Sequence, residues 1–136
     1  MAHDAALEFL RRNPRVVLAT YRRDGQAQLS PVLAAVDAAD RVVISTREGA
    51  VKTRNLRHRP RAAVCALSER FFGTWFSMEG DVDIVSLPDA MEPLVDYYRR
   101  VSGEHPDWQE YREAMTRDQR VLLRITVDRS GPTVQG

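Results

Sequence analysis

Short apolar runs separated by polar turn signals recur along most of the chain, a pattern typical of β-strands joined by short connections. Six strands are expected, at residues 16–21, 26–36, 41–46, 61–67, 74–85 and 121–127. Asp24-Gly25 lies between the first two runs and is a strong signal for a hairpin. Pro31 cannot donate a backbone hydrogen bond, so the second strand should lie at a sheet edge or be bulged at that point. Gly80 predicts a bulge in the fifth strand.

Apolar residues at helical spacing mark four further segments, at residues 5–12, 50–58, 88–101 and 107–117. Asp4 is a candidate N-cap for the first helix, and Pro88 is a favourable start for the third. Strands with mainly short links favour a mainly β fold, an antiparallel barrel with peripheral helices, over a doubly wound sheet. With 136 residues and no repeat or linker, the chain is expected to be one domain, 1–136, with a frayed tail from about residue 130.

Composition and charge exclude several classes of protein. The formal net charge is +1, which argues against a nucleic-acid binder driven by bulk charge. No apolar run approaches ~20 residues, so no transmembrane helix is expected, and residues 1–15 lack the apolar core of a secretion signal. The single cysteine, Cys65, cannot form an internal disulfide and fits a reducing cytosol. We therefore expect a cytoplasmic protein with no nucleic-acid or membrane partner.

Metal and nucleophile chemistry find little support in the sequence. The three histidines are far apart and lack ligand spacing, so no metal site is expected. Cys65 lies inside an apolar strand, as a small core residue would, and no basic group is implied beside it to stabilise a thiolate. Glu79, Asp81 and Asp83 share one strand face, where like charges are usually solvated.

Basic residues gather in one segment of the chain. Residues 47–61 hold six of them against a single acid, Glu48. Gly49 permits close backbone approach, and a helix that begins near Ala50 offers free N–H groups and a positive dipole end to an anion. Lys52, the only lysine in the chain, lies in that first turn, where a cation is mildly unfavourable unless an anion lies beside it. This favours phosphate binding; the alternative is a solvated helix face that pairs with acids elsewhere.

Polar side chains on neighbouring strands extend the candidate site. Ser45 and Thr46 end the strand that precedes the basic helix, and Gln28 and Ser30 lie on a face of the second strand that is otherwise apolar. Together these groups predict a pocket for a phosphate and a flat ring.

Two adjacent aromatic residues, Trp75 and Phe76, offer surfaces on which such a ring could stack. Because they are neighbours in a strand, their side chains point to opposite faces. In the alternative interpretation, one faces the core and the other a dimer interface.

The order of several short motifs resembles the pyridoxamine 5′-phosphate oxidase-like split-barrel superfamily. The resemblance is closer to the actinobacterial branch that uses the deazaflavin coenzyme F420, and the arginine-rich, alanine-rich composition fits a GC-rich genome. It covers about residues 5–127 and rests on three motifs: Gln28-Leu29-Ser30-Pro31-Val32, Val51-Lys52-Thr53-Arg54-Asn55-Leu56 and Gly103-Glu104-His105-Pro106-Asp107-Trp108.

The resemblance implies a six-stranded split β-barrel that works as a homodimer, with two cofactor sites in grooves between the subunits. It implies hydride transfer from reduced coenzyme F420 to a small organic acceptor, and it identifies no catalytic acid or base. Ala50 stands where the family often carries a basic residue, and Arg47 is expected to supply that charge. The implied cofactor contacts are Gln28, Leu29, Ser30, Pro31, Ser45, Thr46, Arg47, Lys52 and Asn55, with Trp75 and Phe76 from the partner subunit.

Three other functions are weighed against this one. FMN could replace coenzyme F420 in the same fold, although the long acidic tail of coenzyme F420 better suits the arginines around Lys52. A cofactor-binding carrier without a substrate would share the pocket. A nucleic-acid module built on residues 52–61 would show affinity that falls steeply with salt, but the segment is short and has no interleaved aromatic residue.

Overall fold

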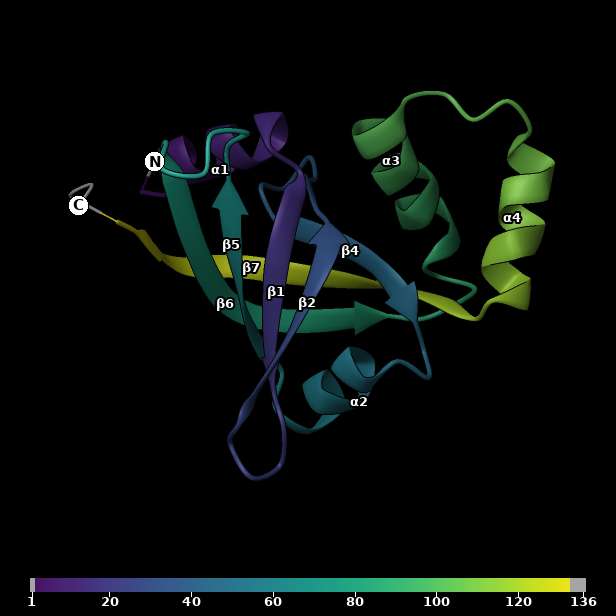
Figure 1. Ribbon diagram of the computed structural model, residues 1–136. Coiled ribbons are helices and arrows are strands. Elements are labelled where there is room, and N and C mark those ends of the chain that lie inside the picture. The colour runs from purple at the N-terminus through teal and green to yellow at the C-terminus, as the bar shows by residue number, and fades with distance from the viewer. Residues whose placement is uncertain (1, 133–136) are drawn as a thin grey trace.

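The computed structural model describes residues 2–132 and shows one curled antiparallel sheet with four helices around it (Figure 1). The helices are α1 (Asp4–Arg12), α2 (Val51–His58), α3 (Met91–Ser102) and α4 (Trp108–Arg117). The strands are β1 (Arg15–Tyr21), β2 (Ala27–Leu33), β3 (Ala35–Val36), β4 (Val42–Arg47), β5 (Arg61–Leu67), β6 (Trp75–Val85) and β7 (Arg120–Gly131).

The strand order shows why the sheet must curl into a barrel. The order is β2-β1-β5-β6-β7-β4-β3, so β2 and β3 lie at opposite edges. Only Ala34 separates them along the chain, and the edges of a flat sheet could not be joined by one residue. Ala34 is fully buried, and its backbone N–H donates to the carbonyl oxygen of Pro14 at 2.8 Å. The mainly β split-barrel architecture expected from the sequence is therefore confirmed.

The core fills the inside of this barrel. Alternate residues of each strand point inward, among them Val16 and Leu18 of β1 and Leu123 and Ile125 of β7. Helices α1 and α2 lie at opposite ends of the barrel (Figure 1). Leu10 of α1 and Leu56 of α2 belong to the same core. The apolar residues of α1 recur at the 3.6-residue period of a helix, so they form one face, and that face is buried.

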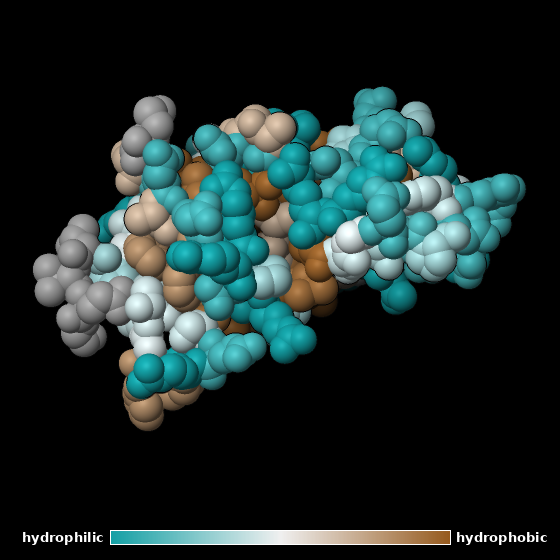
Figure 2. Space-filling model, turned by 90° about the horizontal axis from the view of Figure 1, so that it is seen from above, coloured by the Kyte–Doolittle hydropathy of each residue, from teal (hydrophilic) through white to brown (hydrophobic). Residues whose placement is uncertain are grey.

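Helices α3 and α4 form a separate layer outside β4 and β7. Leu94 and Val95 of α3 pack with Tyr111 of α4 over Val43 and Leu122 on the outer face of the sheet. From above, this helix pair extends to one side as a mainly hydrophilic lobe, with hydrophobic side chains visible between it and the barrel (Figure 2).

The motif of residues 103–108 forms the corner between α3 and α4. Gly103 ends α3 with a φ of 80°, and the Asp107 carboxylate caps α4 by accepting the Glu110 backbone N–H. The indole Nε1 of Trp108 donates to Glu104 at 3.0 Å, and the Arg99 guanidinium lies 4.8 Å from the Trp108 ring centroid. This motif therefore has a structural role in the corner.

The bulge predicted at Gly80 is confirmed. The register of β6 against β7 shifts between Glu79 and Gly80. Asp128 of β7 is therefore the extra residue of the bulge and has no paired residue in β6. A Cβ atom at position 80 would overlap the carbonyl oxygen of Thr126, so the close approach of the two strands requires glycine. Arg61 then donates to Asp128 from both terminal nitrogens, at 2.7 Å each, and lowers the pKa of that carboxyl group.

Several sequence-based boundaries need correction. The structure has seven strands where six were expected, because the long strand at residues 26–36 divides at Ala34 as it passes between the sheet edges. The N-cap of α1 is His3, and Asp4 is the first helical residue; α3 begins at Met91, three residues after Pro88. Strand β7 continues through Gly131, beyond the expected start of a frayed tail, and the rest of that tail, 133–136, lies outside the described residues.

The expectations for β2 as an edge strand and for the Asp24-Gly25 hairpin are confirmed. Strand β2 pairs only with β1, and Pro31 lies opposite Val17. Gly25 has a φ of 87° in the turn between them. No helix within residues 2–132 is both long enough and apolar enough to cross a membrane.

Candidate functional site

The hydroxyls and cations expected at a phosphate site lie at the junction between β4 and α2, but on two faces of the sheet. Thr46 faces the barrel interior and is buried, whereas Ser45 and Arg47 lie on the outer face of the sheet. The hydroxyl of Thr53 donates to the carbonyl oxygen of Arg47 at 2.6 Å, so the first turn of α2 is held against the end of β4. No side chain caps the N-terminus of α2 at Ala50, which leaves its first backbone N–H groups available to an anion.

The basic residues of this segment divide into paired and unpaired groups. Arg57 forms an ion pair with Glu48 at 2.5 Å, and Arg61 forms ion pairs with Asp81 and Asp128. These two arginines therefore fit the alternative interpretation of the basic segment, in which its side chains are solvated and pair with acidic residues elsewhere. Within residues 2–132, Arg47, Lys52 and Arg54 form no ion pair, so the unpaired positive charge is concentrated around the start of α2.

A chain of two hydrogen bonds, one buried and one part-buried, connects α2 to the edge strand β2. The Asn55 side-chain amide donates from Nδ2 to the hydroxyl of Thr20 at 3.1 Å, and that hydroxyl donates to Oε1 of Gln28 at 3.3 Å. Thr20 is completely buried and Asn55 nearly so. Because the Gln28 carbonyl oxygen accepts from Thr20, the Gln28 amide nitrogen is oriented away from Thr20 as a free donor group. Asn55 thus acts through Thr20 to fix the orientation of Gln28.

The predicted contacts on β2 separate onto two faces. Gln28 and Ser30 point toward the barrel interior and are half-buried, while Leu29 and Pro31 are exposed on the outer face. The Ser30 hydroxyl oxygen is buried and has no hydrogen-bond partner in the described part of the chain. A buried hydroxyl usually has a partner, so Ser30 offers an unused polar group beside Gln28.

Arg120 belongs to this region, although sequence reasoning missed it. It lies directly opposite Arg47 in the β4–β7 ladder, and its Nε atom is buried without a partner among residues 2–132. The positive charge of Arg120 also acts on Tyr97 of α3. Burial raises the pKa of the Tyr97 phenol, and a backbone hydrogen bond from Ser45 and the charge of Arg120 both oppose this rise. Like charges directly opposite each other in a ladder are destabilising unless an anion lies between them. Only the strand register shows this pair.

Trp75 and Phe76 lie at the other end of the barrel from Gln28. Phe76 points inward and packs on Phe9 of α1, with ring centroids 5.3 Å apart, and Trp75 is on the opposite face of β6. Phe76 lies in one cross-strand row with Val16, whereas Gln28 pairs with Thr20, four residues further along β1. At about 3.3 Å per residue, this separation is roughly 13 Å. One protomer therefore does not bring these aromatic rings to Gln28.

The site offers hydrogen-bond donors and cations, and the described residues show no acid–base pair in it. The structure also brings no three His, Cys, Asp or Glu side chains of residues 2–132 into a group that could hold a metal ion. Burial raises the pKa of the Cys65 thiol, which disfavours the thiolate. The arrangement can bind and orient an anionic, ring-containing molecule whose own chemistry supplies the reaction.

Comparison with known proteins matches residues 2–132 to the family model of pyridoxamine 5′-phosphate oxidase. A conserved hypothetical protein from Mycobacterium tuberculosis superposes with a TM-score of 0.78 at 26% identity, covering 96% of this chain and 82% of that one. A protein described as an F420 reductase superposes with a TM-score of 0.71 at 21% identity, with coverage of 91% and 94%. A pyridoxamine 5′-phosphate oxidase-related, FMN-binding protein from Nostoc punctiforme gives 0.65 at 15% identity, with coverage of 93% and 83%.

Proposed function

Because the chain belongs to the pyridoxamine 5′-phosphate oxidase family, we propose that it is an oxidoreductase that uses coenzyme F420. The proposed reaction transfers a hydride from the reduced deazaflavin to a small organic acceptor. FMN is the alternative cofactor, and a carrier of coenzyme F420 or a flavin is the alternative role.

The observation that carries the proposal is the unpaired positive charge at the β4–α2 junction. Arg47, Lys52 and Arg54 form no ion pair in the described residues, and Arg120 lies opposite Arg47 with its Nε unpartnered. An uncapped helix N-terminus adjoins them. A phosphate group with a long acidic tail, as in coenzyme F420, would neutralise more of these charges than the single phosphate of FMN.

The chain's own residues would bind and orient the cofactor. Lys52 and Arg47 would hold the phosphate-bearing side chain, with the Ser45 hydroxyl on the same outer face as Arg47 and the buried Thr46 hydroxyl on the inner face. The Gln28 amide nitrogen and the Ser30 hydroxyl are free to donate to polar atoms of the ring or ribityl chain. The bound deazaflavin supplies the hydride chemistry, and the protein positions it and excludes water.

A second copy of the chain would complete the site. Val17, Leu29 and Leu33 are 36%, 65% and 42% exposed on the outer face of β1 and β2. Such a cluster on an edge strand favours an interface that covers it. We propose a homodimer in which the partner brings one of this pair, Trp75 or Phe76, to the groove, because neighbouring side chains of β6 point to opposite faces and one protomer keeps both far from Gln28.

Replacing Lys52 with alanine tests the proposal. We expect Lys52→Ala to weaken coenzyme F420 binding at least tenfold, or about 1.4 kcal/mol, because it removes a cation from the start of α2. Arg59→Ala is the matched control: it removes one positive charge just beyond the other end of α2. A fluorescence titration that finds the same loss in both variants, or in neither, would remove Lys52 from the site.

A further inference from the structure

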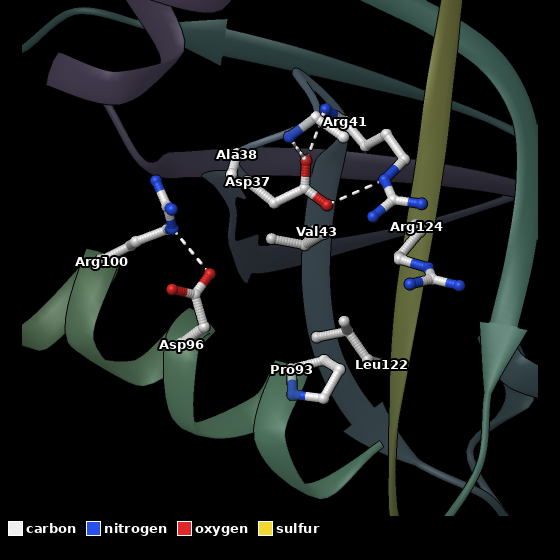
Figure 3. A pocket seen from close by; sticks show the side chains of 10 residues that line it. Asp37, Ala38, Arg41, Val43, Pro93, Asp96, Arg100, Leu122 and Arg124 are labelled. Atoms are coloured by element: carbon white, nitrogen blue, oxygen red, sulfur yellow. Dashed lines mark hydrogen bonds and ion pairs between the residues drawn. The ribbon is translucent and has the colours of Figure 1, made fainter. Parts of the chain in front are cut away.

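A hollow lies on the outer face of the sheet between β4, β7 and α3 (Figure 3). Its volume is about 380 Å³, and it lies between the turn before β4, the start of α3 and the outer face of β4 and β7. Val43, Leu122 and Pro93 give it an apolar floor and wall. Three arginines line it: Arg41 from the turn before β4, Arg100 from α3 and Arg124 from β7. None of the residues expected to contact the cofactor lines it.

The Arg41 charge is already balanced. The Asp37 carboxylate accepts the backbone N–H groups of Ala39 and Arg41 at one oxygen and Nε of Arg41 at the other, each at 2.9 Å. The Asp37 side chain is only 12% exposed. Both of its oxygens are therefore engaged within the turn, as Figure 3 shows for its contacts with Arg41.

The Arg100 charge is balanced in a similar way. Its Nε donates to Asp96 at 2.7 Å, one turn earlier in α3, and Nη1 donates to the carbonyl oxygen of Val36 at 3.0 Å. These contacts hold the Arg100 guanidinium between α3 and the end of β3. Three arginines and two engaged carboxylates leave one positive charge on the lining, and that charge belongs to Arg124.

Arg124 has no charged partner within residues 2–132. It lies between Val43 of β4 and Asp83 of β6 in the sheet, yet no ion pair joins it to Asp83. Its Nε–H group is buried and makes no hydrogen bond in the described chain. A buried guanidinium N–H normally has an acceptor, so the hydrogen-bonding capacity of this donor is left unsatisfied.

We infer that this hollow binds a small monocarboxylate with a compact apolar body. A carboxylate accepts two parallel hydrogen bonds from the planar edge of a guanidinium, and the Nε–H of Arg124 is one of the two donors on such an edge. The apolar body would rest on Val43, Leu122 and Pro93. A dianion such as phosphate is disfavoured because Asp37 and Asp96 line the same hollow, and the volume suits a small organic ligand.

Benzoate is a suitable probe, with benzamide as its neutral isostere. We expect benzoate to bind saturably and to shift the Nε–Hε resonance of Arg124 in a two-dimensional NMR titration, while benzamide does not. Arg124→Gln should weaken benzoate binding at least tenfold, and Arg124→Lys should not restore it, because lysine lacks the planar pair of donors. Arg129→Gln, on the exposed part of the same strand, is the matched control and should bind benzoate like the wild type.

Three results would overturn the inference. These are the absence of saturable benzoate binding, equal binding by wild type and Arg124→Gln, and inorganic phosphate that binds as tightly as benzoate at Arg124. Coenzyme titrations with Arg124→Gln should match the wild type, so this site and the cofactor site can fail independently.

Discussion

Thr20 shows how one buried hydroxyl can organise a binding site. It accepts a hydrogen bond from Asn55 of α2 and donates one to Gln28 of β2, so it links a helix to an edge strand. A hydroxyl has one donor hydrogen, and this direction leaves the amide nitrogen of Gln28 for a ligand. Thr20 is therefore a positioning residue for the proposed cofactor site.

The shape-conserving change Thr20→Val is expected to lower the free energy of unfolding by about 1–3 kcal/mol, because it leaves the buried Asn55 amide and the half-buried Gln28 amide without their partner. Thr20→Ser keeps the hydroxyl and should recover most of that loss, apart from about 0.8 kcal/mol for the missing methyl group. Urea denaturation of the three proteins checks this. Equal stability of the valine variant and the wild type would contradict the bridging role.

Sequence reasoning at the residue scale found side chains whose type alone suggests chemistry. Lys52, Ser45 and Gln28 were identified from charge and polarity, and the structure keeps the cation at the start of α2 unpaired. Thr20 lies in an apolar run and resembles a core residue, and Arg120 becomes notable only when the ladder places it opposite Arg47. Thr20 depends on a contact with Asn55, a helical residue 35 positions away, and Arg120 depends on the pairing of two strands far apart in sequence. No local pattern encodes either contact.

At the scale of elements, the α3–α4 layer depends on a cluster of buried and partly buried aromatic side chains. The Tyr111 hydroxyl donates to the carbonyl oxygen of Leu94 at 2.8 Å, and its ring lies 5.0 Å from that of Tyr98, edge to face. Burial, with a smaller effect from Tyr97, raises the pKa of Tyr111 to about 12 from its ordinary 10.0.

This shift predicts a loss of stability at high pH. Tyr111 ionises first in the unfolded chain, so its contribution is complete below pH 10.0 and is lost as the pH rises through about 12. Tyr111→Phe cannot ionise there. The stability difference between wild type and Tyr111→Phe, measured by urea denaturation, should therefore shrink across this window. A difference that stays constant with pH would show that the phenol is not shielded from solvent.

Local pattern predicted most elements because their signals are short-range. The hairpin at Asp24-Gly25 and the bulge at Gly80 follow from backbone constraints at single residues. The division at Ala34 could not be foreseen, because alternation continues through it: Val32 and Val36 both face inward. What changes there is the strand partner, from β1 to β4, and partner identity is a property of the closed barrel.

At the scale of the whole molecule, the exposed outer face of β1 and β2 predicts a dimer. Light scattering should give twice the chain mass of 15.5 kDa. Leu29→Glu places a charge on that face and should yield monomers, whereas Gln26→Glu adds the same charge at the turn of the same hairpin and should leave the dimer intact. A monomeric wild-type protein would contradict a site shared between two copies.

Parallel titrations with oxidised coenzyme F420 and FMN, followed by tryptophan fluorescence, test the central claim most directly. The unpaired cations at the β4–α2 junction predict micromolar binding of coenzyme F420 and weak binding of FMN. Tighter binding of FMN would contradict the assignment of the cofactor and favour the FMN alternative. Binding of neither would contradict the cofactor site itself, and the proposed oxidoreductase function would be rejected with it.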